Sequence, residues 1–183
     1  MTFDFTSARN NMVDSQVRTS DVTDHDIQDA MRTVARELLL PPGKQALAYA
    51  DVEVACGGGR WLMRPRDAAK LLQALRPRSG ERALAIAAPY AAAVLEAMGL
   101  TVDRLDQGDL SAPPGANYDV MICEGAVPAA PQAWIAALAE DGRLAVVERD
   151  GPVGKAKLYV RSGHGAGATG EDEHTGRPAE RPT

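Results

Sequence analysis

The sequence lacks the features that mark several large classes of protein. No apolar run is long enough to span a membrane, and the first residues do not show the basic-then-apolar order of a signal peptide. Lysines and arginines are interspersed with acidic residues, for a net charge of −5, so no basic stripe is present for duplex nucleic acid or an anionic membrane. We therefore expect a cytoplasmic protein that binds neither nucleic acid nor membrane.

Side chains that bind metals or act as nucleophiles are also scarce. The two cysteines, Cys56 and Cys123, lie in different predicted elements without a C-x-x-C spacing, so we expect two free, partly buried thiols. Two of the three histidines, His164 and His174, fall in a polar C-terminal stretch, and His25 lies near a predicted helix start. We therefore predict no metal site and assign no catalytic residue.

A further absence lies in the clearest strand-to-helix step. Residues 83–99 predict a short buried strand, a tight turn and an amphipathic helix, which together form the first unit of a nucleotide-binding sheet. Turns that bind a nucleotide contain glycines for two reasons. The ligand lies directly against the backbone, and some turn residues take a positive φ, a conformation that costs residues other than glycine about 1–2 kcal/mol each. Here the turn is Ala87, Ala88 and Pro89, and proline also lacks a backbone donor. A loop of this composition does not wrap a nucleoside in the usual manner.

The N-terminal half predicts helices. Thr23 and Asp26 form a capping-box pattern for a helix that continues to about residue 40. Pro65 suits the first turn of a second helix, and residues 46–54 read equally well as extended or irregular. The apolar faces of the two helices are Ile27, Met31, Val34 and Leu38 in the first, and Ala68, Leu71, Leu72 and Leu75 in the second.

From residue 81 onward, short apolar runs alternate with helical patterns, which predicts a parallel sheet covered by helices. The connection 105–119 has two prolines, two glycines and no helical pattern, so we expect one crossover helix to be missing and the sheet to be trimmed. The residues from Ser162 onward contain almost no large apolar side chain and predict a disordered tail. The expected strands are 83–87, 102–105, 119–123, 144–148 and 157–161, and the expected helices are 90–98 and 131–139.

These patterns predict one continuous domain with a tail. Residues 1–80 supply a helical extension and a loop region, 81–161 supply the trimmed α/β sheet, and 162–183 supply the tail. The strand 157–161 is expected to be an exposed edge. Trp61 and Trp134 are expected to pack against helices, although Trp61 lies beside a glycine run and also suits the wall of a cleft.

Several stretches, in this order, resemble the protein-L-isoaspartate O-methyltransferase family. They are MVDSQVR at 12–18, DIQDAMRTVARELLLP at 26–41, ALAYADVEV at 46–54 and GGGRWLMRP at 57–65, followed by GERALAI, YDVMICEGAV and DGRLAVVERDGPVG. The resemblance implies a three-layer, mostly parallel sheet of the class I S-adenosylmethionine-dependent methyltransferase type, trimmed, with a helical N-terminal extension. It also implies S-adenosylmethionine as cofactor and isoaspartyl-containing proteins or peptides as partners, which are methyl-esterified for repair.

The resemblance implies that three residues of this chain bind the cofactor. Tyr90 matches a tyrosine of the family pattern, Asp106 is placed to accept from the ribose hydroxyls, and Asp109 matches an acidic residue near the adenine. Two alternatives stay open: an aromatic residue at position 90 also suits packing, and both aspartates also suit turn chemistry in a loop.

On the substrate side, the resemblance implies that Gly57 and Gly59 belong to a substrate-binding loop, in which Met63 replaces the family's serine. Glu124 follows a strand that ends at the ligand-facing edge of the sheet, which makes it the best candidate for an exposed carboxylate of the site. The alternatives are flexibility for the glycine run, and a capping role in the next turn for the glutamate.

Two main hypotheses for the function follow from these residues. The first is an active carboxyl methyltransferase. The second is a catalytically silent relative that needs no cofactor and binds an unidentified protein or peptide, with binding of another small molecule as a third option. The chemistry asks little of the protein, because a carboxylate is already a nucleophile and the sulfonium methyl is already activated; the protein mainly holds the two about 3 Å apart.

Overall fold

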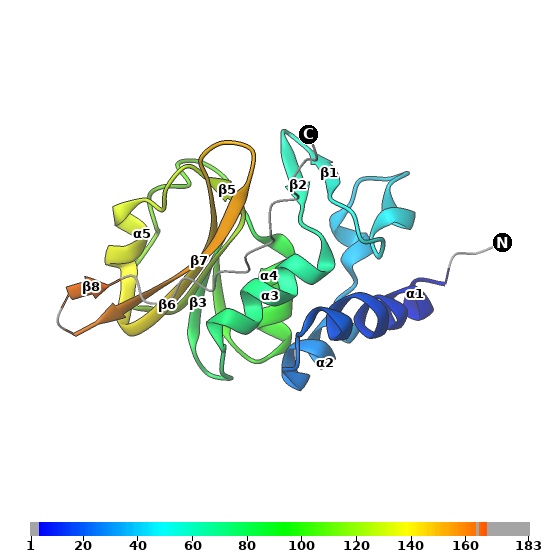
Figure 1. The fold of residues 1–183 in the computed structure, drawn as a ribbon, viewed down its shortest axis with the longest axis horizontal. Helices are drawn as coiled ribbons and strands as arrows, with labels where there is room; N and C mark the ends of the chain where they lie inside the picture. Colours follow the sequence, from blue (N-terminus) through cyan, green and yellow to red (C-terminus); the bar gives the residue numbers. More distant parts are fainter. Residues whose placement is uncertain (1–3, 164, 168–183) are drawn as a thin grey trace, which may run out of the picture.

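A computed structural model describes residues 4–163 and 165–167 of the chain. Figure 1 shows the N-terminal helices at one end, a twisted sheet at the other, and helices α3 and α4 between them. The elements before the sheet are α1 (Phe5–Met12), the π-helical turn η1 (Val13–Val17), the 3-10 turns η2 (Arg18–Ser20), η3 (Arg36–Leu39) and η4 (Gln45–Leu47), α2 (His25–Thr33), the hairpin β1 (Val54–Gly57) and β2 (Arg60–Leu62), and α3 (Pro65–Leu75).

The main sheet has six strands in the order β4-β3-β5-β6-β7-β8. The first four are parallel, whereas β7 and β8 add in antiparallel fashion. The chain begins this sheet in the middle, at β3, and then places β4 on one side and β5 on the other. The strands are β3 (Arg82–Ile86), β4 (Thr101–Leu105), β5 (Tyr118–Val127), β6 (Leu138–Arg149), β7 (Gly154–Ser162) and β8 (Gly165–Gly167), and the helices between them are α4 (Pro89–Ala97) and α5 (Gln132–Ala137).

The sheet separates two apolar clusters, as the period of two in its strands dictates. Along β3, Ala83 and Ala85 face the larger cluster with α2, α3 and α4, while Leu84 and Ile86 face the smaller one. Trp134 of α5 is 2% exposed in the smaller cluster, where its indole donates to the carbonyl oxygen of Leu110 at 2.9 Å. The expected three layers are therefore present.

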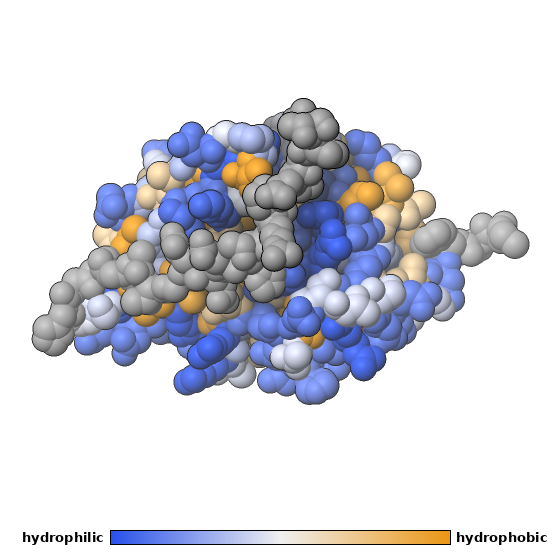
Figure 2. All heavy atoms as spheres, in the orientation of Figure 1, coloured by the Kyte–Doolittle hydropathy of each residue, from blue (hydrophilic) through white to orange (hydrophobic). Residues whose placement is uncertain are grey.

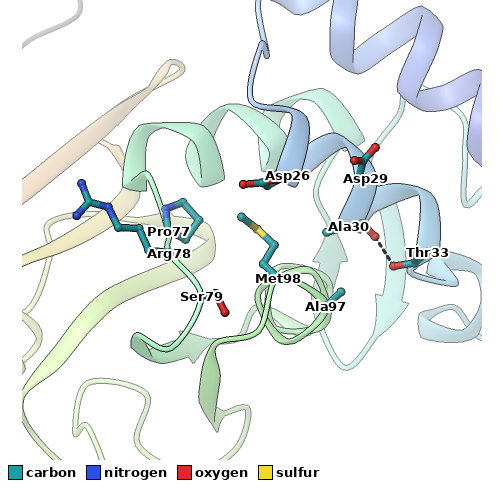
Figure 3. A pocket seen from close by; sticks show the side chains of 9 residues that line it. All are labelled: Asp26, Asp29, Ala30, Thr33, Pro77, Arg78, Ser79, Ala97 and Met98. Carbon is teal, nitrogen blue, oxygen red and sulfur yellow. Dashed lines mark hydrogen bonds between the residues drawn. The ribbon is translucent and has the colours of Figure 1, made fainter.

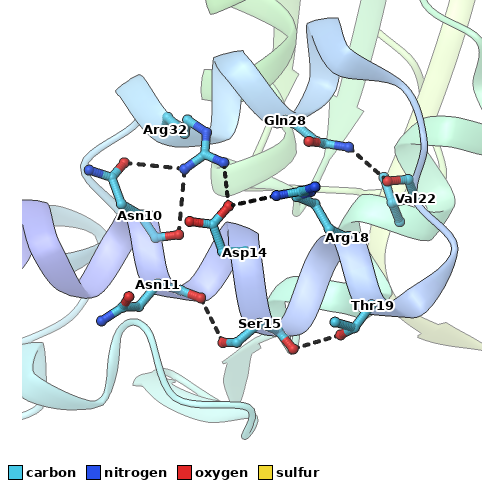
Figure 4. A network of polar contacts seen from close by, with 9 residues as sticks. All are labelled: Asn10, Asn11, Asp14, Ser15, Arg18, Thr19, Val22, Gln28 and Arg32. Carbon is cyan, nitrogen blue, oxygen red and sulfur yellow. Dashed lines mark hydrogen bonds and ion pairs between the residues drawn. The ribbon is translucent and has the colours of Figure 1, made fainter.

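A polar network holds the N-terminal helices together (Figure 4). The carboxylate of Asp14 in η1 accepts from the guanidinium of Arg32 in α2 at 2.7 Å and from that of Arg18 at 3.3 Å. Gln28, buried in α2, donates to the carbonyl oxygen of Val22 at 2.9 Å. These contacts fix the angle at which α2 leaves the first helices.

Most of the predicted elements in the sheet are present with shifted ends, and α3 begins at Pro65 and buries its predicted face. The connection from β4 to β5 contains no helix or strand, as expected. The prediction of a continuous helix to about residue 40 is wrong, because α2 ends at Thr33, Val34 is extended, and Leu38 is 74% exposed in η3. The capping residue is also different: the carboxylate of Asp24, not a Thr23–Asp26 pair, accepts from the N–H groups of Asp26 and Ile27.

The expectations for the end of the chain need correction as well. Ser162 belongs to β7, and residues 165–167 pair with Val160, Arg161 and Ser162 as β8, so this part of β7 is not an exposed edge. Residues 168–183, the rest of the expected tail, lie outside the described residues. Among the described residues, the outer strands of this sheet are β4 on one side and β8 on the other.

The described surface is mainly polar. The face in Figure 2 is mostly hydrophilic, with apolar atoms in separate spots. No helix among residues 4–163 and 165–167 combines the length and the apolar character needed to cross a bilayer. The large apolar side chains that stand exposed are Leu38, Leu47, Val52, Trp61 and Val153.

The N-cap of α2 gives a test of this local structure. Replacing Asp24 by alanine removes the acceptor for two helix N–H groups, and we expect the free energy of unfolding to fall by about 1 kcal/mol. Thr23→Ala is the matched control and is expected to change it much less, as measured by urea unfolding. Equal losses for both variants would contradict the assignment of the cap.

Candidate functional site

The carboxyl ends of β3, β4 and β5 meet at one edge of the sheet. Because β4 and β5 lie on opposite sides of β3, the direction of the chain reverses there, which is where sheets of this class hold ligands. Ala87 follows β3, Asp106 follows β4, and Glu124 lies within β5. The structure thus brings three of the predicted site residues, Tyr90, Asp106 and Glu124, to one place.

The turn between β3 and α4 holds an alanine in a strained backbone conformation. Ala87 has φ = 45°, in the left-handed region that favours glycine, and its N–H donates to the carbonyl oxygen of Leu105 at 3.0 Å. Ala88 has φ = −127°, and Pro89 opens α4. The geometry of a glycine turn is therefore kept at position 87 although the residue has a β-methyl group.

Glu124 is buried, which corrects the expectation of an exposed carboxylate. It is 5% exposed, and its Oε1 accepts from the N–H of Ala91, in the first turn of α4, at 3.0 Å. Burial raises the pKa of this carboxyl to about 7, although the nearby Arg36 and the N–H groups of Ala91 and Tyr90 lower it. The carboxylate of Asp106 also raises the pKa of Glu124, so the two groups lie within electrostatic reach.

Two further buried polar residues, Arg36 and Tyr90, lie beside this carboxylate. Arg36 is fully buried in η3, with its guanidinium carbon 4.5 Å from the centre of the Tyr90 ring. Its Nε donates to the carbonyl oxygen of Ala48 at 2.7 Å, and its Nη2 donates to that of Met63. Sequence reasoning missed Arg36, because an arginine in an amphipathic segment gives no signal that it is buried.

The polar atoms of this cluster are incompletely satisfied. Nη1 of Arg36, Oη of Tyr90 and Oε2 of Glu124 are buried and have no hydrogen-bond partner among the described residues. Desolvation raises the pKa of Tyr90 above its ordinary value, so its phenol keeps its proton. The three side chains form a compact polar cage over the start of α4.

The other predicted site residues lie apart from this cage. Asp109 is exposed and accepts from the N–H and the hydroxyl of Ser111, at 2.9 and 2.6 Å, which lowers its pKa. Gly57 and Gly59 lie at the β1–β2 turn with φ of 95° and 75°, and a Cβ at either position meets no atom within 4 Å. Trp61, next to them on β2, is 60% exposed rather than packed. The hairpin is thus open to a partner.

The described residues also form two shallow hollows away from this edge. Figure 3 shows one of about 530 Å³ between α2, the connection 77–79 and the end of α4, where Asp26, Arg78 and Met98 contribute to the wall. The other, of about 590 Å³, lies between α5 and the end of β7. Neither includes the turn at Ala87. Within the described part of the chain, no group of histidine, cysteine, aspartate or glutamate side chains is arranged to hold a metal ion.

An adenosyl cofactor fits this edge only in part. Asp106 follows β4 at this edge, and the cage holds polar atoms without partners among the described residues. In contrast, the methyl group of Ala87 stands where a cradling turn has bare backbone, and Pro89 has no N–H. The N–H of Ala91 is occupied by the protein's own Glu124.

Comparisons with known proteins agree on one family. The chain is 34% identical over 168 residues to protein-L-isoaspartate O-methyltransferase 1 of Rhodopseudomonas palustris, covering 76% of this chain and 69% of the relative. It is 31% identical over 167 residues to the protein-L-isoaspartate O-methyltransferase of Methylorubrum populi, covering 76% and 79%. No protein-family model matches the chain.

Two solved structures share the fold. A structure of a protein-L-isoaspartate O-methyltransferase has a TM-score of 0.69 and 19% sequence identity, covering 85% of this chain and 60% of the other. A Plasmodium falciparum structure assigned to the same enzymes, solved in complex with S-adenosyl-L-homocysteine, has a TM-score of 0.71 and 15% identity, covering 86% and 91%.

The sheet, its helical layers and its ligand edge define an α/β protein of the methyltransferase type. Within that class, the chain belongs to the protein-L-isoaspartate O-methyltransferase family. The resemblance seen in the sequence and the expected fold are confirmed.

The strained turn predicts that one glycine stabilises the protein. In Ala87→Gly the left-handed backbone loses its steric cost, and we expect the free energy of unfolding to rise by up to about 1 kcal/mol. Ala88→Gly is the control, because φ = −127° suits alanine and glycine there only adds freedom to the unfolded chain. Thermal unfolding distinguishes the two, and destabilisation by Ala87→Gly would contradict the assignment of strain.

Glu124 predicts a dependence of stability on pH. Its pKa is about 7 in the folded protein against an ordinary 4.5, so between these values the folded protein holds a proton that the unfolded chain has released. Stability is therefore expected to fall as pH rises through this window. Glu124→Gln keeps an acceptor for the N–H of Ala91 and should remove this fall in urea unfolding at stepped pH. A wild type and variant that differ by a constant amount across the window would refute the shift.

Proposed function

We propose that this chain performs the reaction of its family, the methyl esterification of isoaspartyl carboxylates in damaged proteins, with S-adenosylmethionine as donor. The observation that carries the proposal is the meeting of Asp106 and Glu124 where the chain direction reverses at β3, in a member of this family. The cofactor supplies an already activated methyl group. Isoaspartyl-containing proteins or peptides are the partners that this proposal implies, and the cytoplasm is the proposed compartment.

The proposed tasks of this chain's residues are binding and orientation. Asp106 holds the ribose hydroxyls, Asp109 and Tyr90 lie on the cofactor side, and the open turn at Gly57 and Gly59 admits the substrate peptide against its backbone. No general base is required, because an isoaspartyl carboxylate is ionised at neutral pH. Arg36 connects the proposed cofactor side to the proposed substrate side. It contacts the ring of Tyr90 and also donates to the carbonyl oxygen of Met63, the residue that follows β2 of the hairpin.

A second candidate function is favoured by a specific observation at the same edge. The methyl of Ala87 and the ring of Pro89 stand in the turn after β3, and the carboxylate of Glu124 already accepts from the N–H of Ala91. A protein closed in this way uses no cofactor and acts by binding protein segments, with the hairpin around Trp61 as the exposed contact surface.

One pair of measurements separates the two functions. For an active enzyme we expect calorimetry to detect binding of S-adenosylhomocysteine, and radiolabelled S-adenosylmethionine to methylate an isoaspartyl peptide but not the same peptide with normal aspartate. Because the turn lacks glycine, we expect affinity weaker than about −8 kcal/mol, which corresponds to micromolar binding. Absence of both heat and methylation at millimolar ligand would eliminate the enzyme and leave the binding protein.

A further inference from the structure

Glu124 contacts α4 from outside that helix. The N-cap residue of α4, Ala88, has no side chain that can accept. The acceptor for the N–H of Ala91 comes from β5, 33 residues beyond Ala91 in the chain. A helix N-terminus concentrates unpaired N–H groups and partial positive charge, and in nucleotide-binding sheets the N-terminus after the first strand receives an anionic part of the ligand. The carboxylate of Glu124 takes that position here.

The surroundings of Glu124 show that this is more than an ordinary helix cap. Asp24, the half-buried cap of α2, uses a single oxygen for two N–H groups. Glu124 is instead 5% exposed, faces the buried Arg36 and Tyr90, and keeps Oε2 without a partner. A carboxylate moved out of water into such a site loses hydration that the N–H groups of Ala91 and Tyr90 do not fully restore.

The cage has the properties of an anion-binding site. It combines the N–H of Ala91, a fully buried guanidinium with one unpartnered nitrogen, and a phenol with an unpartnered oxygen. The anionic group next to these donors is the carboxylate of Glu124, which belongs to the protein itself. The carboxylate of Asp106, which follows β4, and the thiol of Cys123, the residue before Glu124, also lie within electrostatic reach of Glu124.

We propose that the carboxylate of Glu124 is a built-in occupant of the ligand position at the N-terminus of α4, and that it keeps the adenosyl site of this chain closed. This inference deepens the proposed function and rests on that function's site lying at the β3–β4–β5 edge. Ligand binding there requires Glu124 to leave the N–H of Ala91. Shortening the side chain should open the site without any change in the turn.

The test measures S-adenosylhomocysteine affinity by calorimetry in the wild type, Glu124→Ala and Glu124→Gln. We expect Glu124→Ala to bind at least about tenfold more tightly than the wild type, equivalent to about 1.4 kcal/mol. Glu124→Gln keeps the volume and an acceptor, so its affinity should stay near that of the wild type if occupancy, rather than charge, closes the site. If Glu124→Gln binds S-adenosylhomocysteine as tightly as Glu124→Ala, the charge of Glu124 and not its volume closes the site. That result would overturn the proposal that the side chain occupies the ligand position.

Asp24→Ala is the matched control, because it also removes a carboxylate from a helix N-terminus but lies on α2. It should lose stability without gaining affinity. A folded Glu124→Ala, judged by circular dichroism, whose affinity is within about twofold of the wild type would overturn the proposal.

Formate rescue covers the case in which Glu124→Ala does not fold. A small carboxylate should then occupy the position that Glu124 has vacated. We therefore expect formate to restore the fold of Glu124→Ala, or of the milder Glu124→Ser, and chloride at equal ionic strength to restore neither. Failure of formate to restore either variant would also overturn the proposal.

The outcomes separate this inference from the proposed enzyme. A wild type that neither binds nor methylates, beside a Glu124→Ala that binds, supports the occupant and refutes the enzyme. A wild type that methylates an isoaspartyl peptide, beside a Glu124→Ala with unchanged affinity, supports the enzyme and refutes the occupant.

Discussion

The hydrogen bond from the N–H of Ala91 to Glu124 joins the parts of the molecule on which any function depends. It connects β5 to the first turn of α4, and through the neighbouring Arg36 it reaches η3 and the segment after the β1–β2 hairpin. The N-terminal extension and the sheet therefore share one buried polar centre. A shift in any of these elements alters the environment of the others.

Such a centre is stable only while its charges are compensated. Removing an ion from water costs several kcal/mol in a protein interior, and a charged partner with good hydrogen bonds is needed to offset this. The guanidinium of Arg36 has two backbone carbonyl oxygens and the face of the Tyr90 ring as partners. The carboxylate of Glu124 has the N–H groups of Ala91 and Tyr90 and the positive charge of Arg36. Burial of the Glu124 carboxyl raises its pKa, and these favourable contacts offset that effect only in part.

The cofactor edge of this protein keeps the architecture of its family with altered chemistry. The backbone at Ala87 still takes the conformation that glycine adopts without cost, and Asp106 still follows the second strand of the sheet. The connection from β4 to β5 has no helix, so β4 is left as an outer strand. The family relationship is thus visible in the backbone, while the side chains at the turn decide how much room a ligand has.

The sequence by itself determined the elements whose signals are local. Short apolar runs alternating with helical patterns predicted the parallel strands, Pro65 predicted the start of α3, and the absence of glycine marked the turn after the first strand as different from a nucleotide-binding turn. Only the tertiary structure decided that Glu124 is buried on α4, that Arg36 lies over Tyr90, and that β8 covers part of β7. Burial and pairing of this kind depend on contacts between residues that are far apart in the chain. Hydrophobic periodicity shows only which face of a segment is apolar, so it carries no information about these contacts.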